Sequence, residues 1–306
     1  MRILEKMYKS SKECPMKHEI SFYSEGMLVA ADLYMPENIK EGAVLPAIVL
    51  CHGFAGIKEI LLPDYAELFC SKGYIALVFD YRGFGKSEGE RGRLVPIEQI
   101  SDVRNAITYI GSLPEVDSGK IGLWGSSFGG ANVISAAAID VRVKCIVAQL
   151  TFGDGERVIT GNMNADERAK LMGMLLKAQE RQVLKNKPLL LSPDQILTDN
   201  DSKNFYNNAL EQYPELKTKL PITILQNIIE YKPEDYIARS NVPVLLIAAE
   251  YDTACPCKES TYLYEKAIAP KQLFIMERTR HYDVYAGENF IVSSGKALEW
   301  FEQYLK

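Results

Sequence analysis

The chain has 306 residues, of which 47% are hydrophobic and 25% charged, a composition typical of a globular protein and unlike that of fibres or disordered chains. With 35 basic and 40 acidic residues the net charge is -5, and the basic residues form no dense run, so nucleic acid is not expected as a partner. Residues 1–15 lack the apolar core of a secretory signal, and no stretch approaches the ~20 apolar residues of a membrane-spanning helix. We therefore expect a cytoplasmic protein without a membrane partner, whose six cysteines are reduced thiols.

Two strands are predicted first, His18 to Tyr23 and Met27 to Tyr34, joined as an antiparallel hairpin by the turn at 24–26. Short apolar runs rich in β-branched residues then alternate with helical patterns, which is typical of a parallel sheet covered by helices on both faces. Strands are predicted at 46–51, 74–79, 120–124, 143–150, 242–249 and 272–276, and helices at 63–71, 96–113, 128–138, 256–267 and 292–305. The predicted fold class is α/β, with a mostly parallel twisted sheet flanked by helices.

The alternation stops at about residue 151 and resumes after about residue 235. Within this segment helical signals dominate and no convincing strand is found. Asn164, with Glu167 three residues later, resembles a capping box at the start of a helix that Pro188 ends. We therefore expect an α/β core, residues 1–150 and 236–306, interrupted by a helical insertion at 151–235.

A Gly-x-Ser-x-Gly motif, residues 125–129, lies between the predicted strand 120–124 and the predicted helix 128–138. In this strand-turn-helix context the motif is typical of a nucleophile presented at the apex of a tight turn. Ser127 is the candidate nucleophile. Gly125 and Gly129 are small because strand and helix must approach each other closely on either side of the turn. A glycine-rich turn with incidental serines is the alternative.

A serine hydroxyl needs a base to take its proton, and the chain contains three histidines. His18 lies in the first predicted strand, and His52 directly follows the strand 46–51. His281 lies in the loop after the last predicted strand, where a base can reach the edge of the sheet at which the turn of Ser127 lies. His281 is therefore the candidate base, with a surface histidine as the alternative.

The acid that orients this base is expected between the nucleophile and the histidine in the chain. Asp252 follows the strand 242–249 and is preferred, because Glu250 is expected to lie still on that strand. Glu250 and Asp283 remain alternatives for the acid.

Backbone N–H groups must also hold the oxyanion that forms when a serine attacks a carbonyl. The first is expected from Phe128, the residue after the nucleophile, and the second from Phe54, in the loop after the strand 46–51. We expect His52 to hold this loop in place, with a role as a second base as the alternative.

Other motifs fit cofactor sites poorly. The tripeptide Gly85-Lys86-Ser87 suggests a phosphate-binding loop, but the position that would need the first glycine is Asp80. The same loop has Glu88 where a dinucleotide-binding motif needs its third glycine. The histidines are far apart in the chain and form no metal-binding motif. No cofactor and no metal are expected.

Four segments resemble those of the α/β-hydrolase superfamily: 52–54, 79–85, 123–130 and 281–285. More narrowly they are similar to a branch that includes dienelactone hydrolases, the S15 (X-Pro dipeptidyl-peptidase) peptidase domain and fungal polyketide transferases or thiohydrolases. The resemblance implies that Ser127, Asp252 and His281 form a catalytic triad. It also implies that the insertion at 151–235 is a helical cap over the pocket. Apolar cap residues are expected mainly to pack the cap on the core, with one or two methionines facing substrate: Met163, Leu171, Met172, Met174, Leu175 and Leu176.

These parts predict a serine hydrolase acting on carboxylic esters or thioesters of small to medium apolar acids, through an acyl-enzyme on Ser127. An acyltransferase or thiohydrolase of a biosynthetic pathway is the first alternative, because the same acyl-enzyme can react with an alcohol or amine. An amidase or peptidase and a hydrolase-fold ligand receptor are further alternatives. The expected partner is a small acyl substrate, and a homodimer is the default expectation for any assembly.

Overall fold

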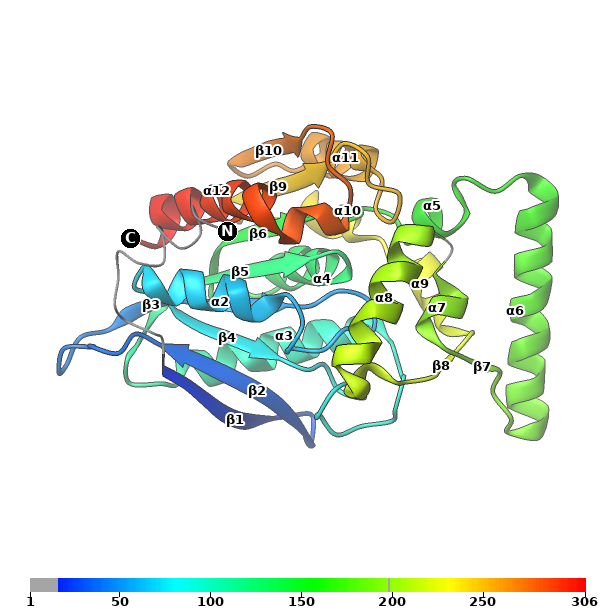
Figure 1. Cartoon of the computed structure of the whole chain (residues 1–306), viewed down its shortest axis with the longest axis horizontal. Helices are drawn as coiled ribbons and strands as arrows, with labels where there is room; N and C mark the ends of the chain where they lie inside the picture. Colours follow the sequence, from blue (N-terminus) through cyan, green and yellow to red (C-terminus); the bar gives the residue numbers. More distant parts are fainter. Residues whose placement is uncertain (1–15, 198) are drawn as a thin grey trace.

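An eight-stranded sheet runs through the centre of the computed structural model, which describes residues 16–197 and 199–306 (Figure 1). The strand order is β1-β2-β4-β3-β5-β6-β9-β10. β1 and β2 form the predicted antiparallel hairpin, β2 is antiparallel to β4, and the remaining neighbours are parallel. The strands are β1 Met16–Ser24, β2 Met27–Met35, β3 Leu45–Cys51, β4 Ile75–Phe79, β5 Val116–Ser126, β6 Val143–Gln149, β9 Val244–Ala249 and β10 Lys271–Met276. The predicted α/β class is confirmed.

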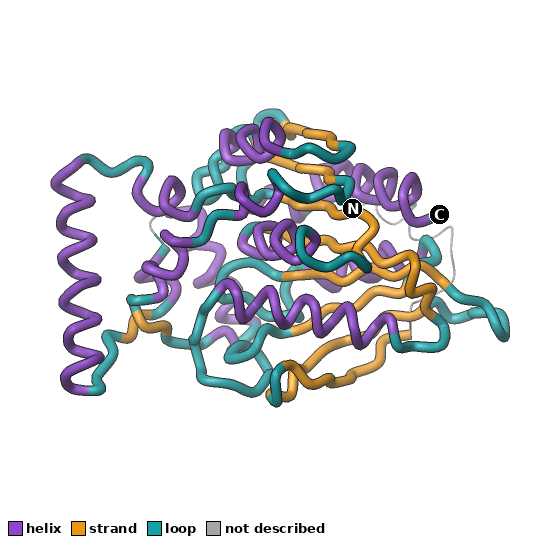
Figure 2. The backbone as a smooth tube through the Cα atoms, turned by 180° about the vertical axis from the view of Figure 1, so that it is seen from behind, coloured by secondary structure: helices purple, strands orange, loops and turns teal. Residues whose placement is uncertain are grey.

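Continuous apolar runs form the central strands because both faces of the sheet are covered. Every residue of β4 and β9 is buried, as expected for parallel strands between two helical layers. Helices lie on both faces of the sheet (Figure 2). Apolar side chains of α3, α4 and α11 pack in the core on one face, and those of α2 and α12 pack on the other. These helices are α2 Leu62–Ser71, α3 Pro96–Gly111, α4 Phe128–Ala137, α11 Cys257–Lys266 and α12 Gly287–Leu305.

The predicted insertion at 151–235, called the cap below, spans most of the chain between β6 and β9. Its elements are α5 Gly155–Thr160, α6 Ala165–Lys185, β7 Leu190–Leu191, α7 Pro193–Ile196, α8 Asn200–Gln212, η1 Pro214–Leu216, β8 Leu220–Pro221, α9 Ile224–Glu230 and α10 Pro233–Ile237. The expectation of no strand was wrong, since β7 and β8 pair as a short antiparallel ladder. They are two residues long, too short for hydropathy alternation to reveal them.

The longest cap helix, α6, stands apart from the body of the molecule (Figure 1). The predicted capping box is confirmed: Asn164 accepts from the backbone N–H of Glu167, whose side chain accepts from the backbone N–H of Asn164. The helix buries only Leu175 and Ala178.

The expectation that the apolar cap residues mainly pack the cap on the core was partly wrong. Leu175 is buried in the core and Leu171 packs against it, but other residues of this set do not. Met172, Met174 and Leu176 are exposed. No helix in the described part of the chain has both the length and the apolar character that crossing a bilayer requires.

Candidate active site

Ser127 lies at the turn between β5 and α4 with φ 56° and ψ -123°, a backbone conformation that is strained for a residue with a side chain. The turn is possible because its flanking residues are glycines. A Cβ atom on Gly125 would lie 2.2 Å from the carbonyl oxygen of Gly129, and one on Gly129 would lie 2.2 Å from the carbonyl oxygen of Cys51. The close approach predicted for these two glycines is confirmed.

His281 and Asp252 form a buried pair, with Nδ1 of His281 2.7 Å from Oδ2 of Asp252. The other carboxylate oxygen, Oδ1, accepts the backbone N–H groups of Ala254 at 2.9 Å and Cys255 at 2.7 Å. An ionised carboxylate only accepts hydrogen bonds, so Nδ1 of His281 carries the proton. This tautomer leaves Nε2 as the nitrogen that can accept a proton.

The two alternative acids have other partners. Glu250 accepts the backbone N–H of Arg278 at 2.7 Å, and Asp283 accepts that of Arg280 at 3.2 Å. The structure thus brings Asp252 to His281, but the reason given for preferring it was wrong. β9 ends at Ala249, so Glu250 also lies beyond the strand.

The loop after β3 lies directly against the nucleophile. A Cβ atom on Gly53 would be 3.1 Å from Cβ of Ser127 and 3.6 Å from its Oγ. Phe54 and Phe128 both line the cavity that contains Ser127. Phe128 is the first residue of α4, where backbone N–H groups have no partner within the helix. The two residues predicted as oxyanion donors therefore both line the cavity that contains Ser127.

His52 hydrogen-bonds within this loop, as expected, and to the backbone after β4. Its Nδ1 donates to the carbonyl oxygen of Gly53 at 2.9 Å, and its Nε2 accepts from the backbone N–H of Tyr81 at 3.5 Å. Burial lowers the pKa of His52 to about 4, so the ring is neutral near pH 7 and can accept at Nε2.

Asp80, which follows β4, anchors the far end of the same loop and was not identified from the sequence. Its buried carboxylate accepts the backbone N–H groups of Lys58 at 2.7 Å and Lys86 at 2.8 Å. Gly85 packs so closely on it that a Cβ would lie 2.2 Å from the carboxyl group. The loop that contains Gly85-Lys86-Ser87 therefore wraps around Asp80. Burial raises the pKa of Asp80 to about 6.

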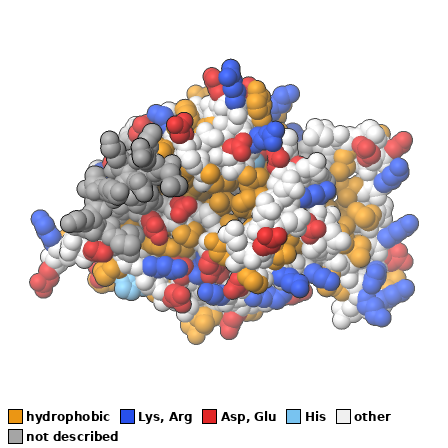
Figure 3. All heavy atoms as spheres, viewed as in Figure 1, with side chains coloured by type: hydrophobic (Ala, Val, Ile, Leu, Met, Phe, Trp, Pro, Cys, Tyr) orange, Lys and Arg blue, Asp and Glu red, His pale blue; other side chains and the backbone are white. Residues whose placement is uncertain are grey.

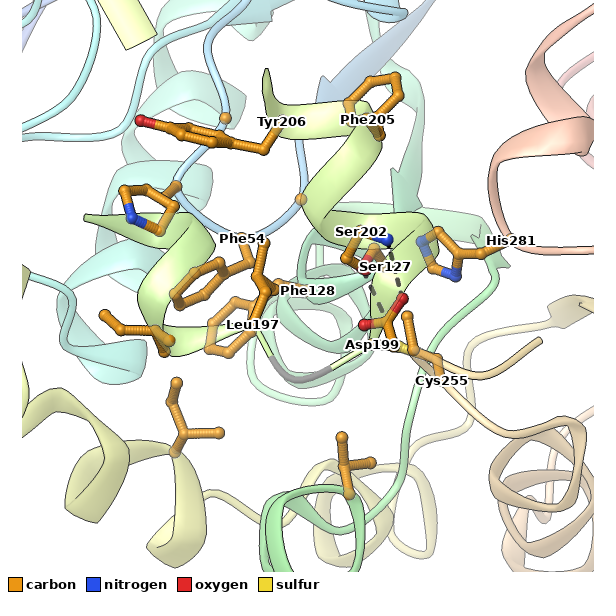
Figure 4. Close-up of a pocket in the computed structure, with 18 of the residues that line it drawn as sticks. Phe54, Ser127, Phe128, Leu197, Asp199, Ser202, Phe205, Tyr206, Cys255 and His281 are labelled. Atoms are coloured by element: carbon orange, nitrogen blue, oxygen red, sulfur yellow. Dashed lines mark hydrogen bonds between the residues drawn. The ribbon is translucent and has the colours of Figure 1, made fainter. Parts of the chain in front are cut away.

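A cavity of about 620 Å³ lies between the core and the cap and is lined by both Ser127 and His281 (Figure 4). Hydrophobic side chains also gather beside the cap on the face in Figure 3. The cap contributes mainly apolar side chains to the lining: Val158, Ile159, Met163, Leu171, Met174, Leu191, Ile196, Leu197, Phe205, Tyr206, Ala209, Leu216, Ile222, Leu225 and Ile228. Among the described residues, no group of three or more His, Cys, Asp or Glu side chains is arranged to hold a metal ion.

Cys255 is a second nucleophilic side chain in the cavity that sequence reasoning missed. Its Sγ lies 3.9 Å from Oγ of Ser127, and the side chain is buried. Burial, together with the charge of Asp252, raises the pKa of Cys255 well above its usual range. A thiol is a weak nucleophile compared with a thiolate, so Cys255 is not activated for attack. The sequence held no signal for this contact because 128 residues separate the two side chains.

Comparison with known proteins identifies the family. The model of the X-Pro dipeptidyl-peptidase (S15) family matches residues 25–283. The chain is 41% identical over 284 residues to an uncharacterized 31.7 kDa protein of the traX-finO intergenic region of Escherichia coli, covering 92% of this chain and 97% of the relative. It is 32% identical to the quorum-quenching protein AidA of Acinetobacter baumannii, covering 89% and 90%. It is 28% identical to the thiohydrolase aneE of Aspergillus aculeatus, covering 89% and 88%.

Solved structures agree with this placement. The structure of DcsB in complex with its substrate analogue has a TM-score of 0.83 and 27% identity, covering 95% of this chain and 99% of that one. The α/β hydrolase GrgF from Penicillium sp. sh18 has a TM-score of 0.79 at 22% identity, covering 95% and 99%, and supports the fold. The chain therefore has the α/β-hydrolase fold and belongs to the S15 peptidase-like family.

Proposed function

We propose that this protein is a serine hydrolase that cleaves carboxylic esters or thioesters through an acyl-enzyme on Ser127. The observation that carries the proposal is the position of Ser127 at its strained turn, in the same cavity as His281, whose Nδ1 is 2.7 Å from Asp252. A nucleophile, a base in the required tautomer and an acid that orients the base are the parts that such catalysis needs.

In the first half of the reaction, Oγ of Ser127 attacks the carbonyl carbon while Nε2 of His281 takes the hydroxyl proton. The backbone N–H groups of Phe54 and Phe128 donate to the oxyanion that forms. When this intermediate collapses, the bond to the alcohol or thiol breaks and His281 gives its proton to the leaving group. Asp252 stabilises the imidazolium that exists between these two proton transfers.

In the second half, His281 takes a proton from a water molecule, which attacks the acyl-enzyme. Collapse of the second oxyanion releases the carboxylic acid and returns the proton to Ser127. Each N–H donor to an oxyanion is worth on the order of 10² to 10³ in rate, so the placement of the loop after β3 also contributes to the rate.

The cavity favours an apolar acyl group. Its volume of about 620 Å³ lies within the usual range of small-molecule sites, and its walls are mainly aliphatic and aromatic. The cavity residue Arg157 is paired with Glu259 at 2.8 Å and Glu234 at 2.5 Å, so its charge is already compensated. The name of the thiohydrolase relative supports thioesters as substrates, and the quorum-quenching relative supports a small-molecule substrate.

Acyl transfer is the second candidate function. The acyl-enzyme is common to both reactions, and an alcohol or amine that binds in the same cavity would replace water in the second half. The family also takes its name from a peptidase, so amide cleavage belongs in the same test.

The test begins with a fluorophosphonate probe, which reacts with activated serines. The wild-type protein and the Cys255→Ala variant should be labelled, and Ser127→Ala should not be. p-Nitrophenyl esters of increasing chain length, matching thioesters and an X-Pro p-nitroanilide then define the substrate class, with and without an added alcohol or amine acceptor. Ser127→Ala should lose on the order of a million-fold in rate, as in serine proteases that lack their nucleophile. Absence of both labelling and turnover in the wild-type protein would refute the proposal.

A further inference from the structure

The short loop that carries His281 is held from two sides. On the core side, Asp252 bonds to His281 itself, and the hydroxyl groups of Tyr285 and Ser126 lie 2.6 Å apart. On the other side the loop contacts helix α8 of the cap, whose first turn lies beside Ser127 and His281 (Figure 4).

Three contacts join this loop to α8. The hydroxyl of Tyr282 donates to Oγ of Ser202 at 3.1 Å. The rings of Tyr282 and Phe205 stack, with centroids 4.2 Å apart and an angle of 15° between their planes. The ion pair between the exposed Arg280 and the partly buried Asp201, 3.7 Å apart, adds little stability. Both chain neighbours of His281 therefore contact the cap.

Tyr282 also contacts the imidazole of His281, with ring centroids 4.8 Å apart and an angle of 61°. Burial raises the pKa of Tyr282, so its hydroxyl stays protonated and remains a donor to Ser202. One side chain thus lies between a cap helix and the candidate base. A displacement of α8 moves the surface against which the imidazole packs.

The same helix forms part of the cavity wall. Ser202, Phe205, Tyr206 and Ala209 line the cavity, and Figure 4 places Phe205 and Tyr206 farther along α8 than Ser202, which lies beside Ser127. A long acyl chain on Ser127 has more of α8 to contact than an acetyl group has. Acyl chains of different length therefore stabilise the position of α8 to different degrees.

We infer that Tyr282 is a positioning residue through which α8 sets the orientation of His281. A long apolar acyl chain that binds in the cavity therefore also raises kcat. The inference rests on the proposed function, since it concerns the proton transfers of the same site. It adds that acyl length affects the rate of the chemical steps through the cap, because the contact between Tyr282 and Ser202 links the cavity wall to the base.

The experiment compares kcat and KM for p-nitrophenyl acetate and p-nitrophenyl octanoate in four proteins. These are the wild type, Tyr282→Phe, Ser202→Ala and the double variant. Tyr282→Phe keeps the ring that stacks on Phe205 and removes only the hydroxyl. A matched control is Tyr65→Phe, which removes a buried tyrosine hydroxyl that lies 3.2 Å from Ser293 in the core, outside the cavity.

In the wild type, kcat should be higher for the octanoate than for the acetate. Each single variant should lower kcat for the octanoate about fivefold, the ratio that loss of one neutral hydrogen bond supplies, with KM unchanged. The acetate should lose less, and the double variant should be no worse than either single variant, because one hydrogen bond is removed in all three. Tyr65→Phe should keep the wild-type ratio of kcat between the two esters.

The inference is overturned if folded Tyr282→Phe keeps the wild-type kcat on the octanoate, or if only KM rises. An equal loss on both esters also overturns it, since acyl length would then not act through this contact. If Tyr282→Phe does not fold, Ser202→Ala provides the same test from the cap side. A wild type that neither reacts with fluorophosphonate nor cleaves either ester would refute the proposed function instead.

Discussion

Replacement of Asp252 by asparagine tests the site with the least change in shape. In the wild type, Oδ1 accepts two backbone N–H groups, from Ala254 and Cys255, and Oδ2 faces Nδ1 of His281. An asparagine amide has one oxygen and must choose between these two sides. Turning its NH₂ group toward Ala254 and Cys255 would leave two backbone donors without an acceptor, at about 1–3 kcal/mol each. The NH₂ group should therefore face His281.

A donor opposite Nδ1 forces the proton of the neutral imidazole onto Nε2. That nitrogen can then no longer accept the proton of Ser127. The same change of tautomer lowers kcat about 10⁴-fold in serine proteases, which corresponds to about 5.5 kcal/mol in the activation free energy. We expect Asp252→Asn to show a loss of this size. KM should change little, because Asp252 lies behind His281 and does not line the cavity.

The assay is steady-state hydrolysis of p-nitrophenyl butyrate, with thermal unfolding followed by circular dichroism to establish that the variant is folded. Glu250→Gln and Asp283→Asn are the matched controls, because each changes an acid two positions from Asp252 or His281 in the chain. Both should keep kcat within about threefold of the wild type, as expected for substitutions outside the proposed triad. The reasoning would be refuted if a folded Asp252→Asn variant had a kcat within tenfold of the wild type while either control lost most of its kcat.

Three further predictions follow from the surroundings of the triad. Gly53→Ala places a methyl group 3.1 Å from Cβ of Ser127 and should lower kcat about 100-fold by displacing the loop after β3, which carries the proposed donor Phe54. Gly295→Ala, whose added Cβ meets open space, should leave kcat unchanged, and equal rates in the two variants would contradict this prediction. Because the pKa of Asp80 is raised to about 6 in the folded state, its contribution to the free energy of unfolding is fully present below pH 3.8 and is lost as the pH rises through about 6. In urea unfolding, Asp80→Asn should therefore lower the free energy of unfolding by roughly 3 kcal/mol less at about pH 7.5 than at about pH 3.5. A destabilisation independent of pH would exclude a raised pKa for Asp80. Since burial keeps Cys255 a thiol, iodoacetamide at neutral pH should leave turnover intact; inactivation that Cys255→Ala prevents would show a reactive thiolate.

Features that depend on local chemistry could be predicted from the sequence. The turn at Ser127 was predictable because its requirements, small residues two positions before and after the serine between a strand and a helix, lie within five consecutive residues. The parallel sheet was predictable because strands buried on both faces are continuously apolar.

Features that depend on distant contacts could not be predicted in this way. The choice of Asp252 over Glu250 depends on where β9 ends and on which backbone N–H groups surround each carboxylate. The exposure of Leu176 depends on whether another element covers α6, and a helical hydropathy pattern is the same in either case.

The amino-acid sequence by itself determined the α/β class, the insertion between two late strands and the tight turn at Ser127, because each follows from periodicity or from a short motif. Only the tertiary structure decided that Asp252 faces His281, that Cys255 lies beside Ser127 and that α8 of the cap packs on Tyr282. These contacts join residues from 29 to 128 positions apart in the chain, and their geometry depends on how the sheet, the loops and the cap pack together.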